Sequence, residues 1–142
     1  MKISTRGRYG LRALVELAGA EGPCLTLKNI AERHGMSEYY LEQLFAPLKK
    51  AGLVTSVRGA KGGYRLSKPP DEVTAGDALR ILEGSLVPVD CVGDESAACA
   101  SANCENCSTR SVWERLYAGM NEVLDTIYLS DLAADTIEIK GK

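Results

Sequence analysis

The sequence has no long apolar run. Arg12 and Glu16 interrupt the only N-terminal stretch that could act as the apolar region of a signal peptide. No other stretch approaches the roughly 20 apolar residues that a membrane-spanning helix needs. The 142 residues are 45% hydrophobic and 25% charged, which is too apolar for a disordered chain. We therefore expect a globular, cytoplasmic protein with no membrane partner.

Residues suited to catalysis are scarce. The chain has one histidine, His34, and only one cysteine, Cys24, outside a single short segment. No Cys-x-x-Cys pair follows a βαβ pattern of the kind found in thiol oxidoreductases. A reactive-cysteine enzyme is a rival interpretation, but the sequence predicts a protein without enzymatic activity.

Positive charge is concentrated in the first half of the chain. Residues 1–70 carry 12 Lys or Arg against 5 Asp or Glu, a net charge of +7. Residues 71–142 carry 5 against 14, a net charge of −9, so the overall charge of −2 conceals the division. A basic first half predicts a polyanionic partner for that half alone.

The first half has the pattern of a helix-turn-helix. Apolar residues recur at helical spacing in a first helix that ends near Gly22, and Thr26 and Ser37 can act as N-caps of a second and a third helix. Gly35 can supply the left-handed residue of the turn between them. The third helix runs to Gly52 and has a polar outer face. Two helices joined by so short a turn, the second with a polar face, predict a DNA-binding motif.

Two short strand-like runs follow, residues 53–57 and residues 63–67. The intervening RGAKGG has three glycines together with Arg58 and Lys61, which predicts a flexible hairpin with a cationic tip. Such a hairpin beside a helix-turn-helix is a wing. The expected fold class is therefore mostly α with a small β wing.

The predicted base contacts are Tyr39, Glu42 and Gln43, on the outer face of the third helix. A helix fits the major groove, where Gln can pair with adenine and Glu can accept from cytosine. A guanidinium at a slim wing tip suits a narrow minor groove. Arg58 at that tip is therefore a further predicted DNA contact, and the other cations would bind phosphates. The remaining predicted DNA contacts are Ser4, Arg6, Arg8, Ser37, Tyr40, Lys49, Lys50, Gly59 and Lys61. Each of these alone could be an ordinary surface residue, but together with the wing and the charge division they favour DNA binding.

The second half predicts two further helices. Thr74 and Asp77 form an imperfect capping box that begins a short bridging helix. Beyond the cysteines, a helix of about 20 residues has an apolar face too broad for the small protein around it to cover. That face could pack on the winged domain of its own chain. Because DNA-reading helix-turn-helix proteins usually work as twofold dimers, we expect a homodimer through this helix. The predicted organisation is a winged helix-turn-helix domain at 1–70, a bridging helix and connector at 71–90, a cysteine-rich loop at 91–107 and a long C-terminal dimerisation helix with its tail at 108–142.

Four cysteines, Cys91, Cys99, Cys104 and Cys107, lie within 17 residues. In a reducing compartment clustered thiols more often bind metal than form disulfides. Thiolates suit both zinc and iron-sulfur clusters. Only the last two cysteines have the spacing of a zinc knuckle, and the wider gaps fit a larger cluster somewhat better. The spacing alone leaves both interpretations open.

Four stretches of the chain resemble a known family. These are MKISTRGRYGL, YYLEQLFAPLKKAGLVTSVRGAKGGYRL, VTAGDALRILEG and CSTRSVWERL. They are similar to the winged-helix transcription regulators that include IscR, NsrR and CymR. The resemblance covers nearly the whole chain and implies homodimers that bind double-stranded operator DNA. Many members carry an iron-sulfur cluster on three cysteines of the same loop.

The cysteines place the resemblance nearer to the IscR branch, because the clusterless cysteine-metabolism branch lacks the trio. By position, Cys91, Cys99 and Cys107 match the cluster ligands, and the implied function is sensing of iron-sulfur supply through a 2Fe-2S cluster to control cluster-assembly genes. Some members use a histidine where this chain has Arg110, which cannot ligate at neutral pH. Cys104 is an extra cysteine, either the fourth ligand or a spare thiol. A redox or nitric-oxide sensor and a zinc-stabilised DNA-binding protein are the alternatives.

Overall fold

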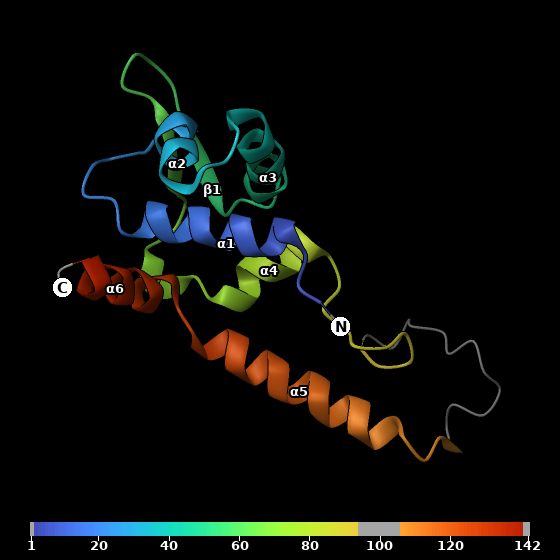
Figure 1. The fold of residues 1–142 in the computed structure, drawn as a ribbon. Coiled ribbons are helices and arrows are strands. Elements are labelled where there is room, and N and C mark those ends of the chain that lie inside the picture. The colour runs from blue at the N-terminus through green and yellow to red at the C-terminus, as the bar shows by residue number, and fades with distance from the viewer. Residues whose placement is uncertain (1, 94–105, 141–142) are drawn as a thin grey trace.

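The structure, a computed structural model, describes residues 2–93 and 106–140. Helix α1 crosses the middle, with the helix-turn-helix and the wing on one side of it and α4 and α6 on the other, while α5 extends along the lower edge (Figure 1). The elements in chain order are α1 (Thr5–Ala18), α2 (Leu27–His34), α3 (Glu38–Lys50), β1 (Val54–Val57), β2 (Gly63–Leu66), the 3-10 helix η1 (Pro70–Glu72), α4 (Ala75–Glu83), α5 (Arg110–Thr126) and α6 (Leu129–Lys140). The predicted fold class, mostly α with a small wing, is confirmed.

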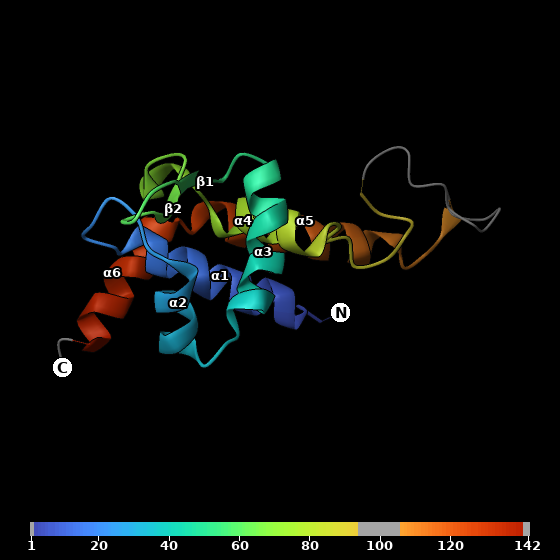
Figure 2. The same ribbon diagram turned by 90° about the horizontal axis from the view of Figure 1, so that it is seen from above.

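The predicted helix starts in the first half are confirmed. The Thr26 hydroxyl accepts a hydrogen bond from the Asn29 amide at 3.1 Å and begins α2. Ser37 accepts from the Tyr40 amide at 3.1 Å and begins α3. Between them, Gly35 has φ of 64°, a left-handed conformation that glycine adopts without steric cost. These local signals place α3 across α1, as Figure 2 shows.

The wing is an antiparallel hairpin in which Val54 pairs with Leu66 and Val57 with Gly63. Its base is also attached to the loop before α2. Leu25 and Tyr64 exchange two backbone hydrogen bonds, of 2.9 and 2.7 Å. A two-stranded hairpin alone is only marginally stable, so this third partner steadies the wing.

One hydrophobic core lies between α1, α2 and α3 and extends below α1. Its largest fully buried side chains include Phe45, Leu14 and Ile30. Val73 and Leu129, which lie far along the chain, belong to the same core. In the part of the chain that is described, no helix is long and apolar enough to cross a membrane.

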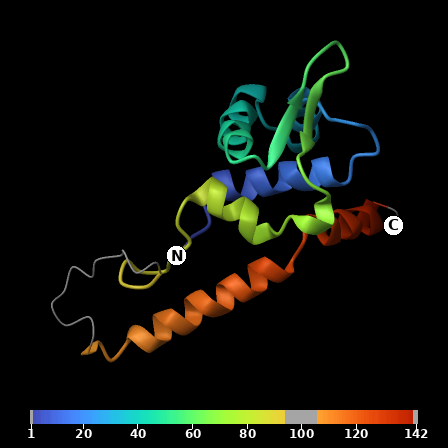
Figure 3. The same cartoon turned by 180° about the vertical axis from the view of Figure 1, so that it is seen from behind.

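The long helix expected beyond the cysteines is present as α5, with 17 residues, but it ends at Thr126, and a second helix, α6, follows where a tail was expected. Ile127 has an extended backbone, with φ of −101° and ψ of 114°. The Ala75 amide donates to the Ile127 carbonyl at 2.8 Å, and the Leu129 amide donates to the Val73 carbonyl at 2.9 Å. This short β-like pairing ends α5 and directs α6 back against α1 and η1, as the view from behind shows (Figure 3).

Candidate DNA-binding surface and cysteine segment

The outer face of α3 carries the three predicted base contacts. Tyr39 has 71% of its surface exposed, and Glu42 and Gln43 are also exposed. The opposite face is anchored by buried apolar side chains, Leu41, Leu44, Phe45 and Leu48. Because α3 is held on one face only, its polar face is free to enter a groove of DNA.

Tyr40 differs from its neighbour Tyr39 in its environment. Its side chain is half-buried, and its ring contacts Tyr9 of α1 edge to face, with centroids 6.2 Å apart and planes at 85°. Ser37 likewise has a local role, because its hydroxyl caps α3. The contact between the two rings places the second turn of α1 beside the first turn of α3.

The wing tip carries the other predicted DNA contacts. Arg58, Gly59 and Lys61 are all exposed. Gly59 has φ of 113°, and a Cβ atom at Gly62 would overlap the backbone of the hairpin, so the turn depends on both glycines. The structure therefore presents two cations on a narrow tip.

The thiol of Cys24, in the loop before α2, forms a hydrogen bond to the wing. Cys24 is half-buried and its Sγ donates to the carbonyl oxygen of Lys61 at 3.2 Å. Its attachment to the wing joins residues 37 positions apart, which no local pattern could have indicated.

The start of α1 holds the predicted contacts Ser4 and Arg6. The Ser4 hydroxyl accepts from the Gly7 amide at 3.3 Å, and it also donates to the Glu83 carboxylate at 2.7 Å. Arg6 is exposed on the first turn. Sequence reasoning missed Glu83; the only local signal was the pair Gly7 and Gly10 inside a helix, which indicates close approach of another element.

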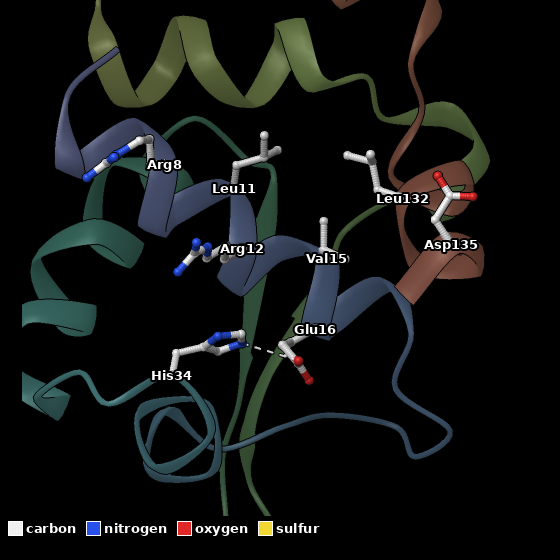
Figure 4. Close-up of a pocket in the computed structure, with 8 residues that line it drawn as sticks. All are labelled: Arg8, Leu11, Arg12, Val15, Glu16, His34, Leu132 and Asp135. Carbon is white, nitrogen blue, oxygen red and sulfur yellow. Dashed lines mark hydrogen bonds and ion pairs between the residues drawn. The ribbon is translucent and has the colours of Figure 1, made fainter. Parts of the chain in front are cut away.

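Arg8 lies at one end of an open groove of about 600 Å³ on the exposed side of α1 (Figure 4). Arg8 and Arg12 lie near the ring of Tyr9, with guanidinium carbons 6.0 and 5.5 Å from its centroid. At the other end, Glu16 pairs with Arg33 at 2.7 Å and contacts His34 at 3.2 Å. The single histidine thus joins α2 to α1.

The cysteine segment is described only at its two ends. Cys91 is half-buried after α4, and Cys107 is exposed shortly before α5. Cys99 and Cys104 lie outside the described residues. Within residues 2–93 and 106–140, no group of three side chains is arranged to hold a metal ion.

Cys107 is chemically distinct from an ordinary thiol. The Thr109 hydroxyl lies 3.2 Å from its Sγ, and this hydrogen bond lowers the pKa of Cys107 below its usual value, with a further contribution from the Thr109 amide. A lowered pKa increases the thiolate fraction, which is the form that binds metals. Arg110, the residue in place of a histidine ligand, instead donates to Glu114 at 2.8 Å.

Helix α5 has no buried residue along its whole length. Val112, Leu116 and Val123 are 54%, 38% and 58% exposed and follow one side of the helix. On the other side, α4 holds α5 through Arg80, which donates to Asp125 at 2.7 and 2.9 Å and to Asn121 at 2.8 Å. The described part of the chain leaves the apolar side of α5 uncovered.

The geometry agrees with a comparison of the whole chain against known families. Residues 3–135 match the model of the Rrf2 family, described as iron-dependent transcriptional regulators. The chain belongs to the Rrf2 family. It is therefore a DNA-binding transcription regulator with a winged helix-turn-helix fold, and not an enzyme.

Both CymR and IscR proteins are similar to this Rrf2-family chain. The transcriptional regulator CymR of Bacillus subtilis strain 168 is 49% identical over 138 residues, which are 96% of this chain and 92% of that protein. The solved structure of CymR, the global cysteine regulator of B. subtilis, has a TM-score of 0.76 at 46% identity, and the match covers 94% of this chain and 97% of that one. The structure of T. potens IscR has a TM-score of 0.72 at 48% identity, with 96% and 88% covered.

Proposed function

We propose that this Rrf2-family regulator is a homodimer that senses iron-sulfur supply through a cysteine-ligated cluster, with 2Fe-2S favoured, and controls cluster-assembly genes. The observation that carries the proposal is the placement of the cysteines. Four thiols lie between the end of α4 and the start of α5, which are the helix beneath the DNA-binding unit and the helix with the uncovered apolar side.

The donor set fits such a group. Thiolates are the usual ligands of iron-sulfur clusters, and the lowered pKa of Cys107 favours its thiolate. Cys91, Cys99 and Cys107 are the proposed ligands, and Cys104 is the proposed fourth ligand or a spare thiol. When bound, the cluster supplies a reversible response to iron, oxygen or nitric oxide.

The residues of the chain would convert ligation into a structural change. Cys91 lies 8 positions beyond the last residue of α4, and Cys107 lies 3 positions before the first residue of α5. When both ligate the same group, they join these two helix ends. Since α4 also packs against α1 and α3, this would bias the placement of the recognition helix, which is a two-state element of the kind that ligand switching requires.

The dimer part of the proposal rests on α5. Twofold dimers place two recognition helices about one turn of DNA apart, roughly 34 Å. The uncovered row of Val112, Leu116 and Val123 provides a self-complementary surface of the kind a twofold interface needs.

A second function has a specific observation in its favour. CymR of B. subtilis, described as a global cysteine regulator, is 49% identical to this chain. A regulator of cysteine metabolism with the same winged fold is therefore the alternative. It predicts protein that carries no cluster and whose operator binding is independent of iron.

The test is an absorption spectrum of protein purified without oxygen, with iron, acid-labile sulfide and zinc measured on the same sample. The proposal predicts visible charge-transfer bands with matching iron and sulfide, which Cys107→Ser removes and Cys24→Ser, the matched control outside the segment, retains. Stoichiometric zinc in colourless protein would identify a structural zinc site. Metal-free protein would favour the cysteine regulator.

DNA footprinting of the cluster-loaded and cluster-free forms on the same operators tests the switch separately. Different footprints are expected, because ligation would join the ends of α4 and α5. Identical footprints would overturn the sensing role even if the cluster were present.

A further inference from the structure

The last residue of α4 is bonded to the residue that begins α1. The Glu83 carboxylate accepts hydrogen bonds from the Ser4 amide at 2.8 Å and from the Ser4 hydroxyl at 2.7 Å. The same hydroxyl accepts from Gly7 and caps the helix. Ser4, predicted as a DNA contact, is therefore already engaged within the protein.

The approach of α4 to α1 depends on two glycines. A Cβ atom at Gly7 would overlap the Glu83 carboxylate, and one at Gly10 would overlap Leu82. These glycines lie three positions apart, on one face of α1. Although each glycine costs helix stability, together they let Leu82 and Glu83 pack directly against the backbone of α1. Figure 1 shows the end of α4 lying against the start of α1.

The start of α1 also lies near the predicted DNA surface. Tyr9 in the second turn of α1 contacts Tyr40 in the first turn of α3, so the N-terminal part of α1 lies beside the start of α3. Lys2 and Arg6 are both exposed beside Ser4. In helix-turn-helix proteins the start of the recognition helix faces the bases, and the phosphates that flank that groove lie within reach of neighbouring elements.

We infer that Glu83 is a positioning residue for DNA binding. Through Ser4, it holds the N-terminal arm, defined as residues 2–4, and the first turn of α1 so that Lys2 and Arg6 reach operator phosphates. Glu83 does not contact DNA itself. Its negative charge alone would weaken binding to a polyanion, so a net favourable effect would have to come from this positioning.

The two possible roles of Glu83 predict opposite changes in DNA affinity when the carboxylate is removed. If Glu83 were only an acid near DNA, Glu83→Ala would remove a repulsion and strengthen binding. If it positions the arm, the same substitution weakens binding by about three- to tenfold at physiological salt, because the arm then reaches fewer phosphates. The slope of log Kd against log salt becomes shallower by about one for each phosphate that the variant no longer binds.

The experiment measures operator affinity as a function of salt for the full chain and for the variants Glu83→Ala and Glu83→Gln. Glu72→Ala is the control, since it removes an exposed acid of η1 with no hydrogen bond to α1. A double-mutant cycle with Arg6→Ala identifies the route. Arg6→Ala should weaken binding in the wild-type background and have little effect beside Glu83→Ala.

Unfolding temperatures measured on the same samples separate positioning from folding. The inference expects a changed salt slope and coupling to Arg6 even in variants whose unfolding temperature is nearly unchanged. Glu83→Gln removes the charge but can still accept from Ser4, so it should bind at least as tightly as the wild type and stay as sensitive to Arg6→Ala; weaker binding by this variant would overturn the inference even if Glu83→Ala does not fold. Binding of a folded Glu83→Ala that is tighter or unchanged, with an effect that adds to that of Arg6→Ala, would overturn it as well.

Discussion

Arg80 on α4 binds Asp125 on α5 through two parallel hydrogen bonds, of 2.7 and 2.9 Å. Gly76 makes the pair possible, because a Cβ atom there would overlap both side chains. Helix α4 therefore contacts two other helices. Glu83, at the C-terminal end of α4, binds Ser4 at the start of α1, and Arg80, one turn earlier in α4, binds α5. The cysteine segment begins at Cys91, 8 positions beyond the end of this helix.

Asp125→Ala is expected to lower the free energy of unfolding by about 1 kcal/mol, because the substitution removes a bidentate pair whose members are partly screened by solvent. The hydrogen bond to Asp125 raises the pKa of Arg80 above its usual value. Because the pKa of Arg80 is higher in the folded protein, the pair stabilises the fold at every pH below the pKa that Arg80 has in the unfolded chain. This stabilisation is lost only in strong alkali. The difference from wild type should therefore be constant between about pH 6 and pH 9.

Chemical denaturation at several pH values measures this difference. Glu122→Ala, which removes an exposed acid of the same helix, is the control and should change stability little. If Asp125→Ala lowers the free energy of unfolding no more than the control does, the pair contributes nothing to stability.

Gln43→Ala is expected to weaken binding to the operator by about 1–3 kcal/mol while leaving binding to unrelated DNA nearly unchanged, since a base contact carries sequence information. Lys49→Ala, at the exposed end of the same helix, should instead weaken both to a similar extent, because phosphate contacts are independent of sequence. Competition binding with operator and random duplexes distinguishes the two. Equal decreases in affinity on both duplexes for Gln43→Ala would exclude a base contact.

Glu42→Ala is expected to relax specificity more than it lowers affinity. A carboxylate among phosphates costs binding energy unless it accepts a hydrogen bond from cytosine. Selection of bound sequences from a randomised pool should therefore show one position where the variant accepts bases that the wild type rejects. An unchanged set of selected sequences contradicts this role.

The elements of the first half and the start of α4 could be predicted because their signals are local. Thr74 and Asp77 bond each other's amides at 3.0 and 3.1 Å, as the capping box three positions apart predicted. Ser37 and Thr26 begin their helices for the same reason. The exposed residues of the outer face of α3 followed from helical spacing alone.

The remaining features depend on residues that meet only in the folded chain. Nothing in the sequence near Ile127 ends a helix, because the cause is pairing with Val73 and Ala75. Glu83 and Ser4 are 79 positions apart, and the sequence predicted Ser4 only as a DNA contact and nothing for Glu83. Periodicity identifies which faces are apolar, but not which distant element covers them.

Val123→Asp is expected to convert the protein to a monomer and to weaken operator binding strongly. Val123 is 58% exposed in the single chain, so the new charge costs little in the monomer and is buried only at the proposed interface. Sedimentation or light scattering measures the oligomeric state. Glu122→Gln, its neighbour on the same helix, is the control, and a dimeric Val123→Asp protein would exclude this face as the interface.

Thr109→Val is expected to raise the pKa of Cys107 toward its ordinary value in metal-free, reduced protein. The Thr109 hydroxyl donates to the thiolate, and its removal takes away the largest cause of the lowered pKa. The pH midpoint for alkylation of the Cys107 peptide, followed by mass spectrometry, should therefore move to higher pH. Thr126→Val is the matched control, because that hydroxyl donates to backbone carbonyls at the far end of α5. An unchanged midpoint in Thr109→Val would mean that this hydrogen bond does not lower the pKa of the Cys107 thiol.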